Sequence, residues 1–158
     1  MIKLRIIIGC DDAGYEYKEI LKKDLKESDF VECVVDAGVG EYGHTAYPKI
    51  GVAVGEAIAT GAADRGLLIC GTGIGVAIAA GKVKGVRASV AHDSYSVERL
   101  VLSNNAQVLA LGQRVIGIEL ARRLVREWLK LHFDPESASA AKVAVLDEYE
   151  ANGSSLWQ

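Results

Sequence analysis

The sequence predicts an α/β fold: a three-layer α/β/α sandwich built on a five-stranded parallel, Rossmann-like sheet. Two observations lead to this prediction. Short apolar runs rich in β-branched residues alternate with longer amphipathic segments along the whole chain, and polar or glycine-rich turns follow the apolar runs. Strands separated by helices form parallel sheets through right-handed crossovers. With 158 residues, half of them apolar, the chain is most simply one domain over residues 1–158.

The first part of the chain is expected to hold two strands and two helices. Residues 4–9 form an apolar run typical of a buried strand, and residues 14–28 place apolar side chains on one face of a helix. A short apolar run at 33–36 predicts the second strand. Pro48 suits the first turn of a helix that runs to about residue 60.

The middle of the chain repeats this alternation. A short helix over 74–82 follows a strand directly, and Asp93 or Ser94 would cap a helix over 95–103. Three further runs have the short, apolar character of strands, and these are 65–70, 86–91 and 107–111.

Two helices complete the predicted fold. Residues 118 to about 132 are strongly amphipathic. A last helix, about 137–151, ends before Asn152-Gly153, which is a typical helix stop signal.

Polar residues follow four of the predicted strands. Ligands of parallel sheets bind beyond the carboxyl ends of the strands, so we expect these residues to meet at one edge. They are Asp11-Asp12, Cys70-Gly71-Thr72-Gly73, His92-Asp93 and Gln113-Arg114.

The segment from Cys70 to Gly75 is the strongest candidate site. A glycine-rich turn between a strand and a helix offers backbone N–H groups to an anion, and the helix N-terminus favours a thiolate at Cys70. A dinucleotide fingerprint is excluded, because it requires glycine at position 76 and the chain has Val76. From position alone, Cys70 is equally well explained as a small buried apolar residue.

The other polar residues also have structural interpretations. Asp11 and Asp12 could cap the first helix; the alternative of a phosphoacceptor receiver domain fails, because its aspartate would follow the third strand. Arg114 is a candidate ligand of phosphate or carboxylate, or else a member of a surface ion pair. His92 is slightly better explained as a structural residue, and His44 is a weak candidate.

Composition restricts the partners and the setting of the protein. The net charge of −3 gives no reason to expect nucleic acid or an anionic membrane as partner. Residues 2–8 are too short and too charged for a secretory or transmembrane segment. Three cysteines cannot all pair within one chain, and none has metal-binding spacing, so a cytoplasmic, reducing setting is the simplest expectation.

Several motifs, spread over nearly the whole chain, resemble those of one enzyme family. They are Gly9-Cys10-Asp11-Asp12-Ala13-Gly14, Ala46-Tyr47-Pro48, Cys70-Gly71-Thr72-Gly73-Ile74-Gly75, Ser103-Asn104-Asn105-Ala106 and Leu111-Gly112-Gln113-Arg114. The chain resembles the B-type ribose-5-phosphate isomerases and their relatives, the galactose-6-phosphate isomerase subunits and tetrose-phosphate isomerases. The resemblance implies interconversion of an aldose phosphate and a ketose phosphate without a metal or organic cofactor.

The resemblance also implies roles for individual residues. Cys70 would be the base that moves a proton between carbons one and two, assisted by Thr72. The enediolate oxygen would be held by the N–H groups of Gly71, Gly73, Ile74 and Gly75.

The remaining roles concern substrate binding and assembly. Asp11 would bind substrate hydroxyls, Tyr47 would line the site, Arg114 would bind phosphate and Asn104 would contact the sugar. The family shares its sites across a homodimer, or a dimer of dimers, in which the Asn104 segment and the C-terminal helix come from the second subunit.

Four features depart from the family's pattern. Ala46 replaces the family's aspartate before Tyr47-Pro48. Asp12 stands where the ribose enzymes commonly have histidine. Ser103 replaces the histidine assigned to opening the furanose ring. The paired arginines that hold phosphate near the start of the last helix are absent, and Lys142 is the one cation between 137 and 142.

The change to Ser103 favours a four-carbon substrate. A tetrose with phosphate on carbon four cannot close a five-membered ring, so no ring-opening histidine is needed. The alternative is a ribose-5-phosphate isomerase that opens the ring with His92 or His44, or takes an already open substrate. A second class of function is a non-catalytic sugar-phosphate-binding or receiver-like module.

Overall fold

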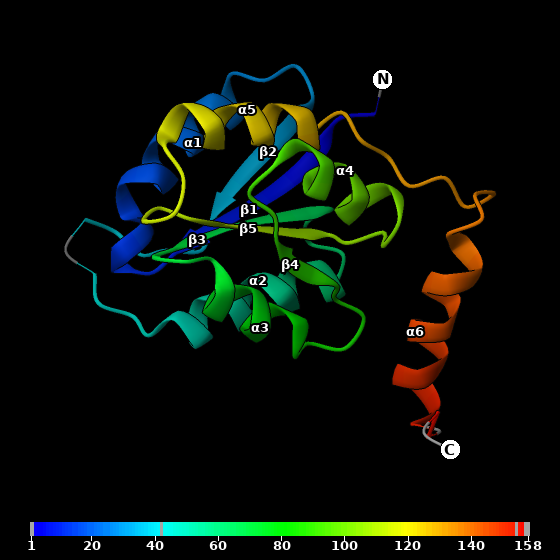
Figure 1. Cartoon of the computed structure of the whole chain (residues 1–158). Helices are drawn as coiled ribbons and strands as arrows, with labels where there is room; N and C mark the ends of the chain where they lie inside the picture. The colour runs from blue at the N-terminus through cyan, green and yellow to red at the C-terminus, as the bar shows by residue number, and fades with distance from the viewer. Residues whose placement is uncertain (1, 42, 154, 157–158) are drawn as a thin grey trace.

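Five parallel strands form one sheet in the order β2–β1–β3–β5–β4 (Figure 1). The computed structural model describes residues 2–41, 43–153 and 155–156. The strands are β1 (Leu4–Cys10), β2 (Val31–Asp36), β3 (Arg65–Cys70), β4 (Ala88–Val90) and β5 (Val108–Gly112). Every residue of β3 and β5 is buried, because helices cover both faces of the sheet; this explains their continuous apolar sequences. The predicted five-stranded parallel sheet is confirmed.

Two layers of helices enclose the sheet. Helices α1, α4 and α5 pack together on one face, while α2 and α3 pack on the other (Figure 1). Their bounds are α1 Tyr15–Lys26, α2 Tyr47–Ala59, α3 Ile74–Gly81, α4 Ser94–Leu102 and α5 Ile118–Trp128. A short 3-10 turn, η1 (Asp12–Gly14), precedes α1. The predicted three-layer sandwich is therefore confirmed, and Asp93 caps α4 by accepting a hydrogen bond from the Ser96 N–H.

A buried arginine determines where α5 ends. Arg65 Nη1 donates to the carbonyl of Trp128 at 2.6 Å, and its other terminal nitrogen donates to the carbonyl of Leu131. Burial lowers the pKa of Arg65 to about 10, which still leaves it charged at neutral pH. Because this cation satisfies the last carbonyls, the helix stops at Trp128 and not near residue 132 as the amphipathic pattern predicts.

Two other boundaries differ from the sequence prediction. Strand β4 covers only three residues, since the carbonyl of Arg87 accepts the N–H groups of Gln107 and Val108 before regular pairing begins. Strand β2 begins at Val31, two positions before the apolar run; exposed Glu32 lies on this edge strand and masks the pattern.

The last helix, α6 (Ala140–Asn152), stands beside the sandwich and belongs to neither layer (Figure 1). It begins later than predicted, because Asp134 closes a turn by accepting hydrogen bonds from Glu136 N–H and Ser137 N–H. Two contacts fix it near the start of β4: Asp147 binds Arg87, and Glu150 accepts from the Gly85 N–H. No helix in the described ranges is long and apolar enough to cross a membrane.

Candidate active site

The crevice of the sheet lies between β1 and β3. The helix after β1 leads outward to β2, whereas the helix after β3 leads in the opposite direction, toward β4. Cys10 pairs with Ile69, so the next residues, Asp11 and Cys70, emerge side by side. Cys70 pairs with Gly112, which brings Arg114 to the same edge. Such a reversal point is where open α/β sheets bind ligands.

Cys70 is buried at the end of β3 and makes a hydrogen bond through its sulfur. The N–H of Gly73 donates to Cys70 Sγ at 2.9 Å. Gly73 caps α3 with a φ of +81°, a conformation that glycine adopts without strain. The donated N–H and the N-terminus of α3 both favour negative charge on the sulfur. The position therefore suits an acid/base group as well as it suits packing.

The turn after Cys70 is shaped by its own side chains. Thr72 Oγ1 accepts a hydrogen bond from the N–H of Ile74 at 3.2 Å. Two of the four N–H groups expected at an enediolate oxygen, those of Gly73 and Ile74, thus contact the side chains of Cys70 and Thr72. All the expected oxyanion donors, Gly71 included, lie in this turn or in the first two residues of α3.

Tyr47 covers the other side of the turn. A side chain at Gly75 would begin 2.6 Å from Cε2 of Tyr47, so the ring rests directly on the glycine backbone. Tyr47 begins α2, followed by Pro48 at the first turn. About half of the ring remains exposed, which leaves it available as a wall of the site.

Asp11 presents a polar group at this edge. Oδ1 of Asp11 is buried without a hydrogen-bond partner among the described residues. Burial, and then the neighbouring Asp12 carboxylate, raise the pKa of Asp11. An orphaned acceptor of this kind is costly unless a ligand satisfies it.

Arg114 lies over the turn of the thiol. Its Nη1 is 3.4 Å from the position that a Cβ on Gly71 would occupy. Within the described ranges, no ion pair involves Arg114. Its charge acts on the Asp11 carboxylate, but an exposed guanidinium outside the close ion pairs of the described residues fits the anion-binding interpretation better than the surface ion pair.

The two histidines near this edge differ in role. His92 Nε2 accepts a hydrogen bond from the N–H of Gly112 at 2.8 Å, and burial lowers the pKa of His92. It is therefore neutral and anchors the end of β5, which supports the structural interpretation. His44 is exposed, with Nδ1 3.6 Å from Asp12 Oδ2.

Three expected substrate contacts lie elsewhere. Ser103 and Asn104 come just before β5, at the amino ends of the strands, and Lys142 is exposed on α6. Ser103 Oγ accepts from Arg99 Nη1 at 3.2 Å, and Asn104 Nδ2 donates to the carbonyl of Arg99 at 2.9 Å. One chain therefore does not bring these residues together with Cys70.

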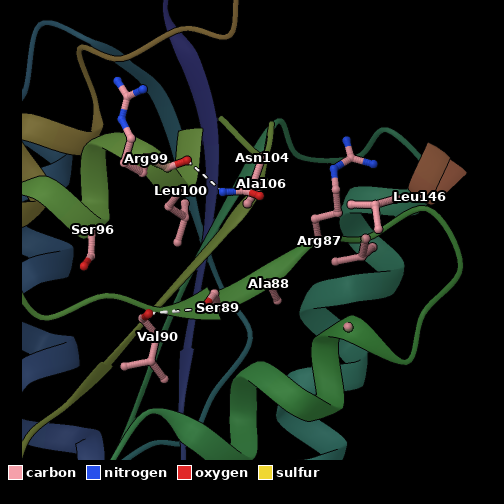
Figure 2. Close-up of a pocket in the computed structure, with 12 residues that line it drawn as sticks. Arg87, Ala88, Ser89, Val90, Ser96, Arg99, Leu100, Asn104, Ala106 and Leu146 are labelled. Carbon is pink, nitrogen blue, oxygen red and sulfur yellow. Dashed lines mark hydrogen bonds between the residues drawn. The ribbon is translucent and has the colours of Figure 1, made fainter. Parts of the chain in front are cut away.

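A groove of about 590 Å³ runs along β4 beside these residues (Figure 2). Ser96 lies at one side and Leu146 of α6 at the other, with Asn104 between them, while the guanidinium of Arg99 points away from the groove. Among the residues that the structure describes, no group of three histidine, cysteine or acidic side chains is placed to hold a metal.

Comparisons with known proteins agree with this geometry. Residues 6–146 match the family model described as Ribose/Galactose Isomerase. A protein named D-erythrulose-4-phosphate isomerase 2 from Mycolicibacterium smegmatis is 63% identical over 93% of this chain and 97% of its own length. Ribose-5-P isomerase B from Listeria innocua is 43% identical over 93% of this chain and 97% of its own. The solved structure of Clostridium thermocellum ribose-5-phosphate isomerase B superposes with a TM-score of 0.88 at 40% identity, covering 95% of this chain and 99% of that one.

Proposed function

Since the chain belongs to the ribose/galactose isomerase family and is an aldose–ketose isomerase of sugar phosphates, we propose that it acts through an enediolate with Cys70 as the base. The observation that carries this proposal is the Gly73 N–H donating to Cys70 Sγ at 2.9 Å, beside Asp11, whose buried Oδ1 has no hydrogen-bond partner among the described residues. The named relatives are isomerases, so the non-catalytic alternative has no support.

The proposed steps need only groups of the turn and its neighbours. The thiolate of Cys70 removes a proton from the carbon next to the carbonyl, and the electron pair moves to the carbonyl oxygen. The N–H groups of Gly71, Gly73, Ile74 and Gly75 stabilise the resulting enediolate. Thr72 passes the hydroxyl proton between the two oxygens, and Cys70 returns its proton to the adjacent carbon.

We further propose erythrose 4-phosphate and an erythrulose phosphate as the substrate pair. Ser103 cannot act as a ring-opening acid/base, and His92 uses Nε2 to hold Gly112, which leaves exposed His44 as the histidine for a cyclic substrate. The relative from M. smegmatis carries a tetrose name. The relative from L. innocua, named for ribose, keeps ribose 5-phosphate as the second candidate.

Parallel turnover assays on D-erythrulose 4-phosphate and D-ribose 5-phosphate test this choice. We expect kcat/KM to be at least about tenfold higher for the tetrose, a difference of roughly 1.4 kcal/mol in transition-state binding. Cys70→Ala protein prepared in the same way serves as the blank for contaminating isomerases. A higher kcat/KM for ribose 5-phosphate would reject the tetrose proposal and leave the isomerase chemistry intact.

Arg114 is proposed as the main phosphate ligand. Replacing it with glutamine removes a charge-assisted hydrogen bond worth about 1.5–3 kcal/mol, so KM should rise about 10- to 100-fold. The matched control is Arg126→Gln, the same change at an exposed position of α5. This control should leave KM unchanged. Inhibition by inorganic phosphate should weaken in parallel; an unchanged KM with Arg114→Gln would contradict the assignment.

The complete site is proposed to form in a homodimer. Ser103 and Asn104 lie at the edge of the sheet opposite to Cys70, Lys142 lies on α6, and α6 leaves Val145, Leu146 and Tyr149 about half exposed. A second subunit that covered α6 would bury this apolar face and bring its own Asn104 segment to the first subunit's Cys70. The three cysteines are free, which supports the expected cytosolic setting.

A further inference from the structure

One buried lysine outside the proposed machinery has an unusual environment. Lys18, on α1, is only 1% exposed. Its Nζ donates to both carboxylate oxygens of Asp36, at 3.0 and 2.8 Å, and to the carbonyl of Val39 at 2.7 Å. Glu19 Oε1 is 3.1 Å away. Burial opposes the charge, but the bonds to Asp36 and Glu19 outweigh it and raise the pKa of Lys18. The group is therefore a buried, fully coordinated cation.

Apart from Glu19 on α1, the partners of Lys18 named above belong to the segment 36–39, which we call the β2 extension. Ala37 N–H donates to the carbonyl of Ile8 at 2.8 Å, continuing the pairing of β2 with β1. Both backbone groups of Cys10 are also held by this extension: its N–H donates to Gly38 and its carbonyl accepts from Val39, at 2.7 and 2.9 Å. Asp36 Oδ1 accepts the N–H of Gly38 at 2.9 Å.

This arrangement connects Lys18 to Asp11. Cys10 immediately precedes Asp11, and the buried Oδ1 of Asp11 has no hydrogen-bond partner in the part of the chain that the structure describes. The β2 extension also leads along the chain toward Tyr47. By contrast, Cys70 is held by Gly73 and α3, on the other side of the crevice.

We propose that Lys18 is a positioning residue of the active site: by binding Asp36 and the Val39 carbonyl it fixes the β2 extension against the end of β1, and so orients Asp11 toward the substrate. This inference rests on the proposed role of Asp11 in binding substrate hydroxyls. Loss of the cation leaves the Val39 carbonyl without its charged donor and releases the extension. Substrate binding should then weaken, while proton transfer at Cys70 should not.

The test compares Lys18→Met with Lys22→Met. Lys22 also donates to Asp36 Oδ2, at 2.7 Å, but its bonds do not include the Val39 carbonyl. We expect Lys18→Met to raise KM about tenfold or more, with kcat changed less than about threefold. Lys22→Met should stay within about twofold of wild type in both constants. General destabilisation would lower the amount of active enzyme, and hence kcat, and would leave KM unchanged.

A double variant shows whether Lys18 affects substrate binding through Asp11 or independently of it. With Asp11→Asn already in place, adding Lys18→Met should raise KM by less than about twofold, because the two changes affect one element. Equal KM values for Lys18→Met and Lys22→Met would overturn the proposal. It would also be overturned if the fold-increase of KM in the double variant equalled the product of the increases in Lys18→Met and Asp11→Asn. If Lys18→Met does not fold, the Asp36→Asn variant tests the proposal instead. We expect its KM to rise about threefold, and an unchanged KM would overturn the proposal. Failure of the proposed chemistry shows separately, as deuterium exchange that survives in Cys70→Ala.

Discussion

Cys70→Ala is expected to abolish exchange of solvent deuterium into the sugar phosphate and to lower kcat by about 10²- to 10⁴-fold, the usual contribution of a positioned general base. The methyl group of alanine cannot accept the proton. The Gly73 N–H, which donates to the sulfur at 2.9 Å, remains free to bind the substrate oxygen. KM should therefore change little, because Asp11, Tyr47 and Arg114 are unaltered.

The other two cysteines provide the contrast. Burial raises the pKa of Cys10 to about 11, so at neutral pH it remains a thiol within the core. Cys33 is exposed on the edge strand β2, and Cys33→Ala is the matched control, expected to keep wild-type exchange and turnover. Deuterium exchange by Cys70→Ala at the wild-type rate would mean that another group is the base.

The layout of the crevice could be predicted because one topological rule determines it. Parallel strands end at a common edge, so the residues after 10, 70 and 112 had to lie along that edge whichever strands were neighbours. The structure adds what periodicity does not contain, namely the strand order. Placement of β4 outside β5 depends on how crossover helices pack, and this leaves no repeat in the sequence.

Lys18 shows why positioning residues are hard to find from sequence. A lysine in an amphipathic helix is normally assigned to the solvated face. Its burial depends on Asp36 and the Val39 carbonyl, which arrive from a different strand and a different loop. Arg65 is a similar case: it stands at the start of a strand, and its function is to satisfy the end of α5. Such long-range pairs follow from the packed fold, not from local patterns.

A mixture of Cys70→Ala and Asn104→Ala subunits is expected to recover about a quarter of wild-type activity, although each variant alone is strongly impaired. In the homodimer proposed above, half of the randomly assembled dimers are hybrids. In each hybrid, one site pairs an intact Cys70 from one subunit with an intact Asn104 from the other. The second site of the hybrid carries both changes and stays inactive. Co-expression with two affinity tags isolates the hybrid, whose turnover is then compared with that of both parents.

The control mixture combines Cys70→Ala with Arg114→Gln. Both residues lie at the same edge of one chain, where Arg114 covers Gly71, so no hybrid contains an intact site and activity should not recover. Recovery in the first mixture and not in the second requires Asn104 to act across the interface. Its position before β5, bonded to the Arg99 carbonyl at the far end of the sheet, prevents it from reaching Cys70 of its own chain. If the first mixture shows only the sum of the parental activities, each chain forms its site without the partner. The Asn104 segment then lines the groove along β4 and does not contribute to catalysis in the other subunit.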